Sequence, residues 1–79
     1  FSIIYMIKKR YEVIQNGTLY PYNSFEKNRD GLAQAYEQAD QVLTDNPELD
    51  SLEIQFATYD ARDVLIACEL VDDLINYTN

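Results

Sequence analysis

The sequence of 79 residues has no histidine, no tryptophan and a single cysteine. The lack of histidine and of a second cysteine each excludes a kind of chemistry. Without histidine, no imidazole is present to act as general base for a serine or cysteine nucleophile. Cys68 has no second cysteine to pair with, so one chain can form neither a disulfide nor a zinc site of cysteine and histidine ligands. We therefore expect a reducing, cytoplasmic compartment, with Cys68 as a small buried hydrophobic residue in a strand.

Glycine is nearly as scarce. Gly17 and Gly31 are the only two glycines, and they lie far apart, so the chain has no glycine-rich phosphate loop. Serines and threonines do not occur in a recognisable nucleophile turn. We expect a protein that is not an enzyme and that binds no cofactor.

Carboxylates are the remaining candidates for acid–base work or metal binding. They fall into three groups: Asp60 with Asp63, Asp72 with Asp73, and Asp45 with Glu48 and Asp50. Acid–base work needs a cleft that shifts a carboxyl pKa towards neutrality, and a chain of this size rarely encloses one. The third group lacks the alternating acids, central glycine and closing glutamate of a calcium-binding loop. We expect solvated turn carboxylates and no metal site.

Long apolar runs are absent too. The run Phe1 to Ile7 is far shorter than the about 20 residues that span a bilayer, and its cations follow it, whereas a secretory signal places them first. We expect no membrane segment. Met6 is typical of a natural start, so we expect residues 1–5 to be a non-native or upstream extension; the alternative is a native strand with alternate residues on one face.

What is present is apolar enough to fold, because 47% of the residues are hydrophobic. A chain of 79 residues makes one domain, residues 1–79. The strongest local signal is Asn16-Gly17 between two strand-like segments, which predicts a type I′ hairpin. That turn pairs Val13 with Tyr20 and Tyr11 with Tyr22, and places these side chains in the core. Pro21 cannot donate a backbone hydrogen bond, so the second strand belongs at a sheet edge.

From residue 31 onward, apolar residues recur with the spacing of one face of a helix. The apolar positions are Leu32, Ala35, Tyr36, Ala39, Val42 and Leu43, and they predict a helix over residues 31–45. We expect Asp30 to cap its first turn. Asn46 is expected to take the left-handed conformation before Pro47 ends the helix.

Strict alternation returns after residue 51. Leu52, Ile54 and Phe56 predict one half-buried strand, and residues 64–70 predict a second. Residues 70–75 either extend that strand or form a short terminal helix, and the shared helical face of Leu70, Val71 and Leu74 favours the helix.

The order is therefore ββαββ. A right-handed crossover makes the second and third strands parallel, and the hairpins are antiparallel. With Pro21 at an edge, the prediction is an α+β two-layer sandwich: one helix packed on a four-stranded antiparallel sheet in the order 2-1-3-4.

Charge is divided unevenly along the chain. Residues 30–79 hold twelve of the fourteen acidic residues and only one cation, Arg62. Such an uneven charge distribution is informative about binding partners and solubility, but not about the fold. With this strand order, we expect the charge to be divided across the width of the sheet.

These patterns favour a small acidic interaction module, of the accessory kind common in bacteria and phages, that docks on a basic protein surface as an inhibitor or nucleic-acid mimic. The candidate docking residues are Glu37, Asp40, Asp45, Glu53, Asp60, Asp63, Asp72 and Asp73. The plainer reading is that small soluble proteins are often acidic. The alternative function is a homodimeric structural protein that associates through an edge strand or the open sheet face, to which Ile3, Ile4 and Tyr5 would add.

Direct nucleic-acid binding through Lys8, Lys9 and Arg10 is the weakest hypothesis, since the net charge of −8 repels phosphate. Tyrosines exposed beside these cations would favour it.

Overall fold

The computed structural model describes residues 7–18 and 20–75. Its elements, in chain order, are β1 (Lys8–Ile14), β2 (Asn23–Glu26), α1 (Gly31–Asp45), β3 (Glu53–Tyr59) and β4 (Leu65–Asp73). The predictions for residues 1–5 lie outside the described residues.

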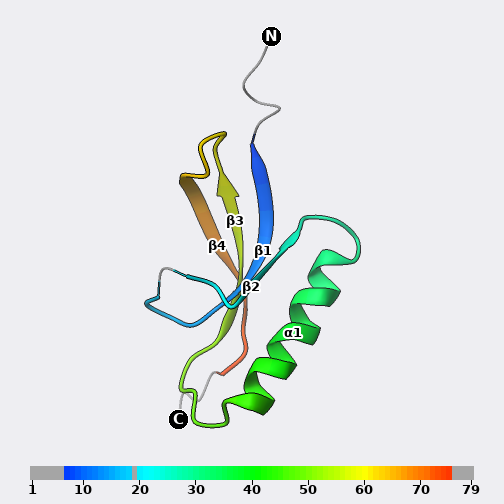
Figure 1. Ribbon diagram of the computed structural model, residues 1–79, viewed down its shortest axis with the longest axis vertical. Helices are drawn as coiled ribbons and strands as arrows, with labels where there is room; N and C mark the ends of the chain where they lie inside the picture. Colours follow the sequence, from blue (N-terminus) through cyan, green and yellow to red (C-terminus); the bar gives the residue numbers. More distant parts are fainter. Residues whose placement is uncertain (1–6, 19, 76–79) are drawn as a thin grey trace.

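The four strands form one sheet in the order β2-β1-β3-β4, and each neighbouring pair is antiparallel. Both β2 and β3 are antiparallel to β1, so they are parallel to each other, and α1 makes the crossover between them. The predicted two-layer ββαββ arrangement with strand order 2-1-3-4 is confirmed. Figure 1 shows α1 crossing one face of the sheet.

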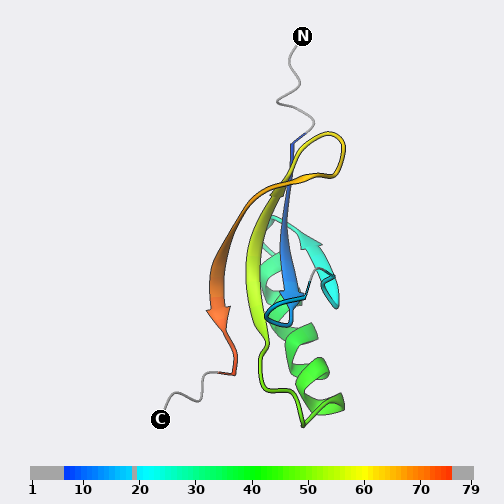
Figure 2. The same cartoon turned by 90° about the vertical axis from the view of Figure 1, so that its left-hand side faces the viewer.

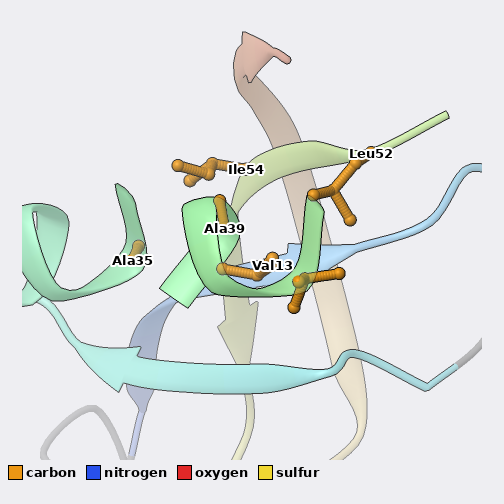
Figure 3. Close-up of a cluster of buried hydrophobic side chains, with 6 residues drawn as sticks. Val13, Ala35, Ala39, Leu52 and Ile54 are labelled. Atoms are coloured by element: carbon orange, nitrogen blue, oxygen red, sulfur yellow. The ribbon is translucent and has the colours of Figure 1, made fainter. Parts of the chain in front are cut away.

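The core lies between α1 and the sheet. Ala35 and Ala39 face the strands from the helix, and Val13, Leu52 and Ile54 meet them from the sheet side (Figure 3). The small alanine side chains allow the helix to approach the sheet closely. Each of these side chains is at most 2% exposed. The apolar stripe predicted for residues 31–45 therefore forms the buried face in part: Ala35, Ala39 and Val42 are buried, whereas Tyr36 is 39% exposed.

The helix is capped differently from the prediction. The Asp30 side chain makes no capping hydrogen bond; instead, Asn28 Oδ1 accepts hydrogen bonds from the backbone N–H groups of Asp30 and Gly31, at 3.0 and 2.8 Å. Asn46 is not left-handed, since its φ is −133°. Its backbone N–H and its side-chain amide both donate to the Val42 carbonyl, so the helix end is satisfied without the left-handed turn.

The first hairpin is the main error in the sequence-based fold. Thr18 N–H donates to the Gln15 carbonyl, so a turn forms at Asn16-Gly17, but among the described non-glycine residues only Asp63 has a positive φ. A type I′ turn needs positive φ at both central residues, whereas turns of types I and II, whose first central residue has a negative φ, splay the two strands. Pairing therefore resumes only at β2.

As a result, the register of the first hairpin is shifted by three residues. Val13 pairs with Asn23 and Tyr11 pairs with Phe25, so Phe25 takes the core position predicted for a tyrosine. Tyr20 is 84% exposed and Tyr22 is 44% exposed.

The predicted terminal helix is also wrong. β4 continues to Asp73, with Asp72 opposite Ile54 and Asp73 opposite Glu53. An irregularity leaves Val71 without an opposite residue, because Leu70 is opposite Gln55 whereas the preceding residue of β3, Ile54, is opposite Asp72. This extra residue breaks the alternation and produces the spacing that looked helical.

The helix covers the sheet incompletely. It packs over β1, β2 and β3, and Figure 2 shows β4 at the far edge of the sheet from α1. A side-chain hydrogen bond of 2.7 Å from the Tyr36 hydroxyl to Asp72 links the helix to β4. Within residues 7–18 and 20–75, no helix is both long and apolar enough to cross a membrane.

Candidate interaction surfaces

One end of the sheet gathers the cations of the chain. We call this the cationic end: Lys8, Lys9, Arg10, Lys27, Arg29 and Arg62. The strand register explains the grouping, because Lys8 at the start of β1 is opposite Tyr59 at the end of β3, and Arg10 is opposite Glu26 at the end of β2. Arg62 lies in the turn that follows β3. A groove of about 520 Å³ at this end is lined by residues 7–10, Glu26 and Lys27.

The opposite end of the strands is acidic. We call this the acid end: Asp45, Glu48, Asp50, Glu53, Asp72 and Asp73. Ile14 at the end of β1 is opposite Glu53, and Glu53 is opposite Asp73, while the turn from α1 to β3 carries Glu48 and Asp50. This turn lies at the bottom of Figure 1, far from the start of β1. In the described part of the chain, no lysine or arginine lies at the acid end.

The charge therefore separates along the strands, between their two ends. This differs from the expected separation across the width of the sheet. The difference arises because the cations of β1 lie at its start and the acids of β4 lie at its end, and because the turn between β3 and β4 returns Arg62 to the end where β1 begins.

The structure brings together four of the eight predicted docking residues: Asp45, Glu53, Asp72 and Asp73. Glu37 and Asp40 are exposed on α1, outside the acid end as defined. Glu48 and Asp50 were predicted to be solvated turn carboxylates, after acid–base work and metal binding had been considered for them, and they were not among the predicted docking residues. Their position next to Asp45 in a turn was the signal that they share its surface.

Asp60 and Asp63 lie at the cationic end instead. Lys8 Nζ is 2.7 Å from Asp63 Oδ1, and this hydrogen-bonded cation lowers the pKa of the Asp63 carboxyl. Asp60 Oδ1 accepts hydrogen bonds from the backbone N–H groups of Arg62 and Val64. Both carboxylates thus have local roles in the β3–β4 turn.

Electrostatic repulsion is evident at the acid end. Partial burial raises the pKa of the Glu53 carboxyl, and the neighbouring negative charge of Asp73 raises it further. The hydrogen bond to Asp72 raises the pKa of the Tyr36 hydroxyl, since the carboxylate favours the protonated phenol. A positive charge brought to this end would relieve the repulsion.

A buried carboxylate on the sheet face opposite α1 was missed by sequence reasoning. Glu12 is only 3% exposed, and its carboxylate accepts hydrogen bonds from Gln55 Nε2, at 2.8 Å, and from the Tyr59 hydroxyl. Burial and this hydrogen bond raise the pKa of Tyr59 to about 12. Both hydrogen-bond donors belong to β3, so the residues next to Glu12 in the sequence did not indicate that it is buried. With both oxygens satisfied, Glu12 joins β1 to β3.

Among the residues that the structure describes, the tyrosines do not form a stacking platform beside the cations. Tyr11 packs against the core and lies 5.3 Å from Phe56 between ring centroids. Tyr20 is exposed and lines a groove of about 310 Å³ with Arg10. Single-strand binding uses successive exposed aromatic side chains along a basic groove. This groove has one cation, Arg10, and of its two tyrosines Tyr20 is exposed whereas Tyr59 is partly buried and donates its hydroxyl to Glu12.

The outer edge strand β4 is the third surface. All its residues except Asp72 are exposed, including Cys68, which was expected to be buried. This expectation failed because Cys68 lies on an edge strand and, opposite Ala57, on the sheet face that α1 does not cover. Among the described residues, no three potential ligands lie close enough together to hold a metal ion.

Comparison of the chain with protein-family models, with curated proteins and with solved structures found no match.

Proposed function

We propose that this protein is a non-enzymatic interaction module that docks its acid end on a positively charged protein surface. The observation that supports this is the division of charge along the strands, which leaves Asp45, Glu48, Asp50, Glu53, Asp72 and Asp73 at one end without a cation among them. A surface of one sign attracts a surface of the other sign, accelerates association and selects against acidic partners.

The raised pKa of Glu53 gives this surface a further reason to bind cations. Its charged form is disfavoured by burial and by Asp73. A lysine or arginine from a partner would stabilise both carboxylates, and this gain is available only in the complex. Binding should then be accompanied by a fall in the pKa of Glu53.

The proposal extends to the kind of partner and to the cellular compartment of this protein. A protein surface basic enough to receive six carboxylates resembles one that binds phosphate groups, so docking would make this protein an inhibitor that imitates nucleic acid. The single cysteine of the chain supports a reducing, cytoplasmic location.

Two matched variants test the proposal. Glu48→Gln with Asp50→Asn removes two exposed charges from the acid end, whereas Glu26→Gln with Asp30→Asn removes two exposed charges near the cationic end. Wild-type protein and both variants are immobilised and used to capture proteins from an extract of the native host, which are then eluted with increasing salt.

We expect a basic protein that binds the wild type and the control variant, binds the acid-end variant at least about tenfold more weakly in a purified titration, and elutes at moderate salt. Equal binding by the two variants, or the absence of any salt-eluted partner, would contradict docking through the acid end.

A further inference from the structure

An apolar groove lies on the helix face of the sheet, between α1 and the uncovered strand β4. Its volume is about 240 Å³. Tyr11 of β1 and Phe56 of β3 line its floor, Leu32 of α1 lines one side, and Leu70 and Val71 of β4 line the other. Tyr11 and Phe56 are opposite each other in the sheet, and their ring centroids are 5.3 Å apart. The groove thus has an aromatic floor between a helix and an edge strand.

Val71 reaches this groove through the irregularity in β4. Leu70 is opposite Gln55 and Asp72 is opposite Ile54, so Val71 is the extra residue of the strand. An extra residue of this kind re-aims side chains and is common next to binding sites. Val71 is 38% exposed and adds to the apolar side of the groove.

One cation and one carboxylate complete the lining of the groove, and both adjoin the Phe56 ring. Lys27 Nζ lies 5.8 Å from the centre of that ring. Glu69 is opposite Phe56 on the neighbouring strand. In the part of the chain that the structure describes, Lys27 and Glu69 do not form an ion pair with each other. Two opposite charges therefore flank one apolar floor, and each is free to contact a ligand.

These two charges define the kind of ligand that fits. Lys27 can hold a carboxylate and Glu69 can hold an ammonium group. A ligand with a single charge would gain one of these contacts and be repelled by the other side chain. The neighbouring charged residues do not line the groove and include both signs: Lys9, Glu26, Arg29, Asp30 and Asp72. Charge complementarity thus favours a zwitterion with an apolar body.

We propose that this groove binds a free α-amino acid with a large apolar side chain, such as phenylalanine or leucine. Its carboxylate contacts Lys27, its ammonium group contacts Glu69, and its side chain packs on Tyr11 and Phe56. Sites for drug-sized ligands measure about 300 to 1,000 Å³, so this groove suits a smaller molecule. Because Lys27 and Glu69 are exposed, each contributes modestly, and we expect a dissociation constant of about 1 mM.

This site goes beyond the proposed function and lies apart from the acid end. The residues that line the groove do not include any of the six residues of the acid end. Binding of an amino acid would leave the docking carboxylates accessible. The acid-end variant Glu48→Gln with Asp50→Asn should therefore bind the amino acid as the wild type does.

An NMR titration of the full chain with L-phenylalanine tests the site. We expect saturable shifts of backbone amide signals centred on Phe56, Glu69 and Val71. Two analogues each remove one charge: phenylpropionate lacks the ammonium group, and phenethylamine lacks the carboxylate. Both should bind at least about threefold more weakly. The absence of saturable shifts with L-phenylalanine, or equal binding of either analogue, would overturn the proposal.

Four variants test the same contacts from the side of the protein. Lys27→Gln and Glu69→Gln each remove one charge from the groove, whereas Lys9→Gln and Glu48→Gln each remove an exposed charge outside it. We expect L-phenylalanine to bind at least about threefold more weakly to the first two variants and unchanged to the other two. Equal binding by all four variants would contradict the assignment of Lys27 and Glu69.

The titration also distinguishes a second copy of the chain as the occupant. Signals of the groove that shift with protein concentration, in the absence of any ligand, would show that a second copy covers it and would overturn the amino-acid site. Loss of partner capture by the acid-end variant, with unchanged binding of L-phenylalanine, would concern only the docking surface. The two proposals therefore fail independently.

Discussion

The two glycines of the chain are required for different reasons, which allows a prediction of the order of two mutational effects. Gly31 is buried where β2 leads into α1, and a Cβ atom added there would clash with the Glu26 carbonyl oxygen and lie 3.1 Å from its carbonyl carbon. Gly17 is exposed, has a φ of +81°, and has no atom within 4 Å of an added Cβ.

The two geometries give different magnitudes for substitution by alanine. At Gly31 the obstacle is backbone, and Glu26 is held in the sheet opposite Arg10, so relief requires moving the end of β2 away from the start of α1. Overpacking of this kind costs about 3 kcal/mol. At Gly17 the cost is that of a left-handed conformation without steric contact, about 1 kcal/mol.

Urea unfolding monitored by circular dichroism measures both effects, provided the slope of free energy against urea stays the same between variants. We expect Gly31→Ala to lower the free energy of unfolding by clearly more than Gly17→Ala does. A domain of this size has only about 4 to 12 kcal/mol of stability, so the Gly31 loss is easily resolved. Equal losses, or a larger loss at Gly17, would refute the close approach of β2 and α1.

Three further outcomes follow from named contacts. Ile54→Ala should lower the free energy of unfolding by about 2 to 5 kcal/mol in urea, because its side chain is fully buried; a loss near zero would contradict the core. The raised pKa of Tyr59 favours the neutral phenol in the fold, so this contribution to stability is complete below pH 10 and is lost as the pH rises through about 12. In a tyrosinate absorbance titration, Tyr59→Phe should lack the group with the highest pKa. An unchanged titration would argue against the Glu12 hydrogen bond. The pKa of Glu53 is raised in the fold, so its contribution to the free energy of unfolding is complete below the unfolded pKa near 4.5 and is lost as the pH rises through the folded pKa. Glu53→Gln should remove this loss of stability with pH and should be more stable than the wild type at pH 7. Parallel curves of unfolding free energy against pH for the wild type and the variant would contradict this prediction.

The parts of the fold that were predicted correctly depend on local period and on chain connectivity. The helix bounds 31–45 match α1, because the apolar spacing and Pro47 define them within the segment itself. The strand order followed from the crossover and from Pro21 near an edge. Neither inference needed the identity of a distant neighbour.

The errors arose where the structure depends on backbone geometry or on distant residues. The Asn16-Gly17 dipeptide does not reveal that Asn16 keeps a negative φ, which decides whether Tyr20 or Phe25 reaches the core. The extra residue Val71 mimics a helical period. Burial of Glu12 depends on Gln55 and Tyr59 of another strand.

The candidate surface was predicted only in part for the same reason. Acidic residues can be counted in the sequence, but their grouping depends on which strand ends meet. The register places Glu53 beside Asp73 and sends Asp63 to Lys8 at the other end, 55 residues away along the chain. A count of charges along the chain could not show that Asp73 and Asp63 lie at opposite ends of the sheet.

Retention on an anion-exchange column tests the division of charge between the two ends most directly. The acid-end variant Glu48→Gln with Asp50→Asn and the control variant Glu26→Gln with Asp30→Asn both reduce the formal net charge from −8 to about −6, so they differ only in where charge is removed. If the acid end makes the contacts with a cationic surface, the acid-end variant elutes at clearly lower salt than the control variant. Elution of both variants at the same salt concentration would contradict a separate acid end.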